Sequence, residues 1–144
     1  MHRLLVAILL TGALQAADIQ AEEGARKAMD NFMTTFNSRD VSAWAGSLNF
    51  PHVRFASNRV RVFPDEADFI RDSKNYVAGL GAGWDHSAWQ EMKVVQSGPD
   101  KVHFSVVFVR YDKNGKAIGT FPSLYIVTLL KGHWGVQGRS SYAP

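Results

Sequence analysis

The spacing of apolar residues predicts helices in the first half of the chain and strands in the second. Between residues 21 and 37, apolar side chains recur at three- and four-residue steps, the period of an amphipathic helix. Asp40 is suited to cap a second, short helix that turns Trp44 inward. Asp65 is placed to cap a third helix. The expected buried stripe of that helix is Ala67, Ile70 and Val77, with Phe69 beside it.

Alternating apolar and polar residues predict a hairpin followed by a meander. The segments "HVRFAS" and "RVRVF" have the pattern of two short strands joined through Ser57 and Asn58. Four further strands are expected at about residues 86–96, 101–111, 117–130 and 134–141, separated by "SGPD", "DKNG" and "KGH". Helices followed by antiparallel strands predict an α+β domain, in which the helices pack on one face of a bent sheet and enclose a cavity.

The first sixteen residues have the pattern of a secretory signal peptide. A positive end containing Arg3 precedes an apolar run from Leu4 to Leu10, which is too short to span a bilayer. We expect export, with cleavage after Ala16 or Ala17, to a periplasmic or secreted location. No membrane contact is then expected, and residues 17–144 form one domain. The alternative is an uncleaved N-terminal helix.

Composition and motifs narrow the chemistry further. The chain has no cysteine, which excludes thiol redox chemistry and thiolate metal sites. Its net charge is only +3 and the basic residues are scattered, so no nucleic-acid surface is expected. The sequence contains no phosphate loop, no G-x-S-x-G, no H-E-x-x-H and no pair of histidines at metal spacing. We therefore expect neither a cofactor nor a metal.

The order of elements, with "LNFPHVRFASNRVRVF", "GWDHSAW" and "SLYIVTLLKGHWGVQGRSSYAP", resembles the NTF2-like superfamily and, within it, SnoaL-like proteins of unknown function. The resemblance implies a cone in which three N-terminal helices lie across a strongly curved, mainly antiparallel sheet. A ligand cavity would open between them. The superfamily includes ketosteroid isomerases, polyketide cyclases, epoxide hydrolases and dehydratases, and also non-catalytic binding modules. Fold alone therefore does not establish activity.

The sequence departs from the isomerase pattern on the first strand of the hairpin. Isomerase-like members place an acidic base there, whereas this chain has "HVRF" and no acid between Asp40 and Asp65. Alternation sends His52 and Arg54 to one face of this strand. If that face lines the cavity, His52 offers a base near neutral pH, and the Arg54 guanidinium offers hydrogen-bond donors for a carboxylate or enolate-like oxygen. The alternative is an exposed hairpin face.

The stretch "GWDHSAWQ" supplies a second histidine. Simple alternation turns Trp84 and His86 toward the cavity, with Asp85 as a neighbour that orients the imidazole. Trp89 breaks this alternation, and a β-bulge near Ala88 would redirect it. The alternative role for His86 is that of a core histidine bonded to a carbonyl group.

Three residues of the later strands complete the candidate site. Arg110 and Tyr125 each share a strand face with an apolar row, and Arg139 lies in "QGRSS" on the final strand, which the resemblance places near the cavity. All three are candidate ligand contacts, together with Arg54 and Trp84. The alternatives are a solvent-facing end for Arg110, a backbone partner for Tyr125, and loop contacts for Arg139. His52 and His86 are the candidate catalytic residues.

Two function classes remain open from the sequence. The first is a cofactor-free lyase or isomerase that acts on a small, partly apolar carbonyl compound, with a histidine moving the proton and Tyr125 and an arginine stabilising the oxyanion. The second is a non-catalytic module that binds a ligand or a protein. A homodimer is expected, since such sheets commonly pair through their outer faces and the strand at 101–111 is apolar on both sides.

Overall fold

The computed structural model describes the backbone of residues 2–144 and the side chains from residue 18 onward. Its helices are α1 (His2–Asn37), α2 (Val41–Gly46), α3 (Glu66–Ser73) and a 3-10 helix, η1 (Tyr76–Gly79). Its strands are β1 (Leu48–Ala56), β2 (Arg59–Phe63), β3 (Trp84–Gly98), β4 (Lys101–Asp112), β5 (Ala117–Leu130) and β6 (His133–Ser141). The predicted signal sequence, residues 1–16, lies outside the residues whose side chains are described.

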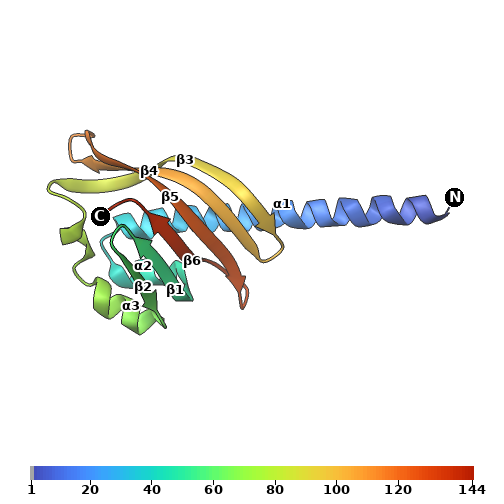
Figure 1. The fold of residues 1–144 in the computed structure, drawn as a ribbon, viewed down its shortest axis with the longest axis horizontal. Coiled ribbons are helices and arrows are strands. Elements are labelled where there is room, and N and C mark those ends of the chain that lie inside the picture. The colour runs from blue at the N-terminus through green and yellow to red at the C-terminus, as the bar shows by residue number, and fades with distance from the viewer. Residues whose placement is uncertain (1) are drawn as a thin grey trace.

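One six-stranded sheet organises the fold, with strand order β2-β1-β6-β5-β4-β3. The hairpin and the four-stranded meander predicted from the sequence are both present, and antiparallel pairing dominates. The exception is the parallel pair between β1 and β6, which joins the hairpin to the end of the chain. Figure 1 shows the curved sheet with the three α-helices on its concave side, so the expected α+β cone is confirmed.

The core lies between α1 and the concave face of the sheet. Ala25, Met29 and Phe32 form the buried side of α1, at the helical spacing that the sequence predicts. They pack in one cluster with Phe104 and Val127 from the middle strands. This packing against the sheet holds the C-terminal half of α1 across the cone. No helix among the described residues is long and apolar enough to cross a membrane.

Capping residues define where the two short helices begin. The Asp40 carboxylate accepts hydrogen bonds from the backbone N–H groups of Ser42 and Ala43, as expected for an N-cap. The Asp65 carboxylate accepts one from the N–H of Asp68. These two caps set the directions of α2 and α3 at one end of the cone.

The predicted buried stripe of the third helix is partly wrong. Phe69 is fully buried, whereas Ala67 is exposed and Ile70 is only half-buried. Val77 belongs to η1, because α3 ends at Ser73. The aromatic ring of Phe69 has the larger apolar surface, and it packs edge-on against Trp44 and Phe63.

Candidate functional site: a cationic cavity in the cone

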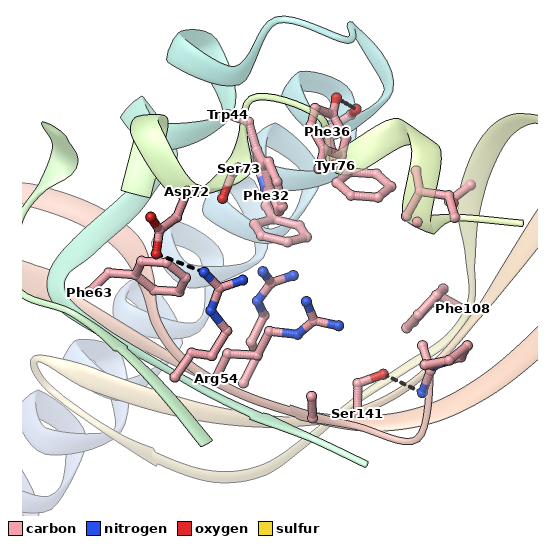
Figure 2. Close-up of a pocket in the computed structure, with 18 of the residues that line it drawn as sticks. Phe32, Phe36, Trp44, Arg54, Phe63, Asp72, Ser73, Tyr76, Phe108 and Ser141 are labelled. Atoms are coloured by element: carbon pink, nitrogen blue, oxygen red, sulfur yellow. Dashed lines mark hydrogen bonds and ion pairs between the residues drawn. The ribbon is translucent and has the colours of Figure 1, made fainter. Parts of the chain in front are cut away.

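A cavity of about 670 Å³ lies between the concave face of the sheet and the helices. One wall is aromatic, and Figure 2 shows its rings facing Arg54, which extends from the sheet on the other side. Tyr76 is fixed at this wall because its hydroxyl donates a hydrogen bond of 2.5 Å to the Phe36 carbonyl. The aromatic residues that line the cavity are Phe32, Phe36, Trp44, Phe63, Tyr76, Phe108 and Tyr125.

Three arginines stand side by side on the sheet beneath these rings. Arg61 on β2 is paired with Arg54 on β1, and Arg54 is paired with Arg139 on β6. Tyr125 on β5 is the partner of Arg139 on the other side. We call Arg61, Arg54 and Arg139 the arginine ladder. Neighbouring strands lie about 4.8 Å apart, and like charges directly opposite one another destabilise a sheet, so the ladder has an energetic cost.

The ladder lacks the carboxylates that would neutralise it. Asp72 on α3 pairs with Arg61 at 2.7 Å, at the outer end. Among the described residues, no carboxylate pairs with Arg54 or Arg139. The two inner guanidinium groups therefore face the cavity with their charge uncompensated.

Arg139 is the most deeply placed member of the ladder. Its guanidinium carbon lies 5.5 Å from the ring centroid of Phe32 and 5.1 Å from that of Trp44, in cation–π contact with both. Its Nε is buried and has no hydrogen-bond partner among the described residues. Burial lowers the pKa of Arg139 to about 10, which leaves it charged at neutral pH. Burial raises the pKa of Tyr125, so its hydroxyl keeps its proton and can donate to an anion.

A further cation, Arg110, reaches the cavity from β4. It is buried, and its Nη1 donates a hydrogen bond of 3.0 Å to the carbonyl of Leu80. Its guanidinium carbon lies 4.9 Å from the centroid of the Phe121 ring. Its Nε is buried without a partner in the described part of the chain. Burial lowers the pKa of both Arg110 and Arg54. Charge repulsion acts in the same direction, from Arg54 on Arg110 and from Arg59 and Arg61 on Arg54.

The charge of the whole lining is strongly one-sided. Asp72 is the single acidic residue among the described residues that line the cavity. The net charge of the entire chain is only +3, so positive charge is concentrated here rather than spread over the surface. Such a cavity attracts and orients negatively charged ligands. The basic residues of the lining are Arg54, Arg59, Arg61, Arg71, Lys74, Arg110 and Arg139.

His52 does not line the cavity, although it shares the inner face of β1 with Arg54 as expected. It is fully buried, its Nδ1 lies 3.0 Å from the carbonyl oxygen of Val136, and its ring packs against Phe63 and Phe69. Burial, together with the nearby Arg139 charge, lowers its pKa from 6.5 to about 3. The imidazole is therefore neutral at physiological pH and holds β1 to β6.

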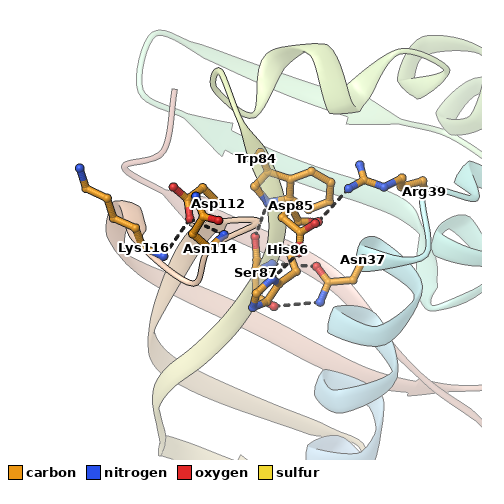
Figure 3. A network of polar contacts seen from close by, with 9 residues as sticks. All are labelled: Asn37, Arg39, Trp84, Asp85, His86, Ser87, Asp112, Asn114 and Lys116. Atoms are coloured by element: carbon orange, nitrogen blue, oxygen red, sulfur yellow. Dashed lines mark hydrogen bonds and ion pairs between the residues drawn. The ribbon is translucent and has the colours of Figure 1, made fainter.

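The inward orientation expected for His86 is wrong. Its side chain is 45% exposed, and its Nδ1 lies 2.8 Å from the neighbouring Asp85 carboxylate (Figure 3). Its ring stacks on Tyr111. The reason is a register irregularity between Trp84 and His86, which reverses the alternation. The residue that lines the cavity from this stretch is Ser87.

A second irregularity, between Trp89 and Glu91, restores the alternation along β3. Trp89 precedes this second irregularity and lies on the same side as Ser87, so it packs inward, with its ring centroid 5.3 Å from that of Tyr125. Trp84 is buried as expected, but it does not line the cavity. Its indole N–H donates to the Ser87 hydroxyl at 3.0 Å, and Arg39 lies over its ring.

The structure thus brings four of the seven candidate residues together. Arg54, Arg110, Tyr125 and Arg139 all line the cavity, where their role as ligand contacts stays a prediction. His52, Trp84 and His86 lie outside its lining.

Sequence reasoning missed Arg61 as a member of the site. A signal for it existed, because the two-residue turn at Ser57 and Asn58 aligns Arg61 with Arg54 across the hairpin. Within the described residues, no three histidine, aspartate or glutamate side chains are grouped so that they could hold a metal ion.

Comparisons with known proteins agree with this architecture. The family model described as NTF2-like protein (DUF6841) matches residues 21–143. No curated protein is detectably similar in sequence to the chain.

Solved structures with the same fold share little sequence with this chain. A ketosteroid isomerase-like protein from Erwinia carotovora atroseptica is 17% identical, with a TM-score of 0.63 over 83% of this chain and 93% of that one. An NTF2-like protein from Novosphingobium aromaticivorans is 12% identical, with a TM-score of 0.71 over 93% and 87%. A putative calcium/calmodulin dependent protein kinase II association domain from Xanthomonas campestris is 16% identical, with a TM-score of 0.60 over 81% and 82%.

Proposed function

The chain belongs to the NTF2-like family DUF6841, and we propose that its cone cavity binds a small organic anion with an apolar, planar body. The observation that carries this proposal is the pair Arg54 and Arg139, two adjacent guanidinium groups without a carboxylate partner among the described residues. A bound carboxylate or related group would neutralise them, and the Tyr125 hydroxyl could donate to the same oxygen. The aromatic wall opposite would cover the apolar part of the ligand.

Binding is a better supported function than histidine-dependent catalysis. Proton transfer in a cavity requires a base within reach of the substrate. Neither His52 nor His86 lines the cavity, and the one acidic side chain among the described lining residues, Asp72, is engaged by Arg61. A lyase or isomerase would find an oxyanion site at Arg139 and Tyr125 but no adjacent base among the described lining residues.

A matched pair of ligands tests the proposal. Benzoate and benzamide have nearly the same shape, but only benzoate carries a charge at neutral pH. We expect benzoate to raise the melting temperature of the full chain and to bind measurably by calorimetry, because a ligand of the native state stabilises it. We expect benzamide to do neither. Raising the salt concentration should weaken benzoate binding, since salt screens the attraction.

Variants locate the binding in the cavity. Arg54→Gln is expected to weaken benzoate binding about tenfold, the loss of one charge-assisted contact. Arg26→Gln is the matched control, because Arg26 is an exposed arginine of α1 outside the cavity lining, and it should bind benzoate as the unmodified protein does. His86→Ala should also bind normally. Equal binding of benzoate and benzamide, or no effect of Arg54→Gln, would overturn the proposal.

We also propose that the protein is exported, as its N-terminal residues predict, and that two copies pair through the outer face of the sheet. Several large apolar side chains are exposed on β1, β2 and β5, which supports such pairing. Phe55 on β1 is paired with Val60 on β2, so these two apolar side chains lie on the same face of the sheet. Those exposed by 40% or more on these three strands are Phe55, Val60, Val62, Leu124, Ile126 and Leu130.

Sedimentation at micromolar concentration checks the oligomeric state. We expect a dimer for the unmodified protein and a shift toward monomer for Leu124→Glu, because a charge in a desolvated apolar interface is costly. Leu124 is 54% exposed, so this substitution should not disturb the core. Monomer alone for the unmodified protein would contradict the pairing.

A further inference from the structure

Three arginines of the cavity lining, Arg54, Arg110 and Arg139, are at least partly buried and have no carboxylate partner among the described residues, and they lie at two separate places. Arg54 and Arg139 are direct neighbours on the parallel strands β1 and β6. Arg110 lies on β4, and β5 runs between β6 and β4. Tyr125 lies on that intervening strand, opposite Arg139 on one side and Phe104 on the other, and charges on all three arginines act on its phenol.

At each cationic position, contacts with neighbouring residues hold a guanidinium group in place. Arg110 is held by the Leu80 carbonyl and by the Phe121 ring, which fix its guanidinium group at the cavity. Arg139 is held beneath Phe32 and Trp44. Both have a buried Nε without a partner among the described residues. Fixed, desolvated donors of this kind favour a ligand that supplies acceptors in the same geometry.

The space between the two positions is apolar. Phe108 lies two residues before Arg110 on the inner face of β4, and Tyr125 on β5 also lines the cavity. Phe32 packs edge-on against Tyr125, with ring centroids 5.4 Å apart, and forms part of the opposite wall. A flat ring can contact these aromatic side chains while its substituents reach the arginines on either side.

A monoanion and a dianion differ in how many of the two cationic positions they can neutralise. One carboxylate at Arg54 and Arg139 would leave Arg110 buried and unneutralised. Asp72 could not compensate it, because that carboxylate is bonded to Arg61 at the rim. Two acidic groups on one ligand would bring a partner to both positions.

Resting on the anion binding proposed above, we infer that the cavity selects dianions, with one acidic group at Arg54 and Arg139, the second at Arg110, and a planar apolar body between. Arg110 is then the residue that determines specificity for the second charge. Aromatic dicarboxylates are the simplest compounds of this class.

Two dicarboxylates and their own monoesters test this selectivity by calorimetry on the full chain. Isophthalate and terephthalate differ in the separation of their carboxylates, and monomethyl esterification removes one charge from each without changing the ring. We expect at least one dicarboxylate to bind about tenfold or more tightly than its monoester, the value of a second charge-assisted contact. This comparison needs no variant.

Arg110→Gln is expected to bring that ratio close to one, whereas Arg26→Gln should keep it. Arg110→Met is a second variant, since it fills the same space without an unpaired amide. If benzoate binds in preference to benzamide but both dicarboxylates bind no better than their monoesters, this inference is wrong and the anion site stands. If benzoate does not bind, the proposed function itself fails.

Discussion

An Arg139→Met variant is expected to bind benzoate at least about 100-fold more weakly than the unmodified protein and yet to unfold at a temperature about 5 °C higher. The loss of binding follows from the central position of Arg139 between Arg54 and Tyr125. The gain in stability follows from removing a buried charge that lies directly opposite another arginine. Replacing a buried ion pair by apolar residues is often neutral or stabilising by about 1–4 kcal/mol, and Arg139 has no carboxylate partner among the described residues to lose.

Loss of the contacts to Phe32 and Trp44 reduces this gain, since a cation–π contact contributes about 1 kcal/mol. Methionine keeps most of the length of the side chain, so little space is left empty. Calorimetric melting without ligand measures the stability, and titration with benzoate measures the binding. A variant that melts at a lower temperature than the unmodified protein would show that the arginine ladder is there for stability.

Acidification is expected to destabilise the protein through His52, and His52→Asn should remove about 3 kcal/mol of that loss between pH 7 and pH 4. The pKa of His52 is lowered from 6.5 to about 3 in the folded state. The unfolded chain therefore takes up this proton below pH 6.5, while the folded chain resists it down to about pH 3. Stability is complete above the unfolded pKa and is lost as the pH falls through this window.

Asparagine is chosen because its side-chain N–H₂ can replace the donor at His52 Nδ1, which lies 3.0 Å from the Val136 oxygen, and it does not titrate. Urea unfolding at several pH values gives the free energies. His103→Asn serves as the control, because that ring is only partly buried and bonds a glutamine side chain. If the unmodified protein and His52→Asn lose stability in parallel, the imidazole is not the group responsible.

The elements of this fold could be predicted because each has its own local pattern. The helical period around Met29 and Phe32, the caps at Asp40 and Asp65, and the alternation in the last four strands are properties of short segments. Which side chains of β3 face the cavity could not be predicted in the same way. Its irregularities are set by pairing with β4, and one of them turns His86 outward and Ser87 inward.

The candidate site could be predicted only in pieces. Arg54, Arg110, Tyr125 and Arg139 each had a suitable residue type on a strand, and the cavity lining contains all four. Their mutual arrangement depends on the parallel register of β1 and β6, which no local pattern specifies. The same pairing buries His52 against Val136, so a histidine with the features of a base is a structural residue here.

The parallel pairing of β1 with β6 also has a kinetic consequence. The hydrogen bond from His52 to Val136 joins positions 84 apart in the chain, and closing so long a loop is slow compared with forming the hairpin or the meander. The two adjacent arginines meet only when this last strand docks. We therefore expect the proposed anion affinity to appear only once β6 has docked, and a benzoate-dependent signal during refolding would time that step.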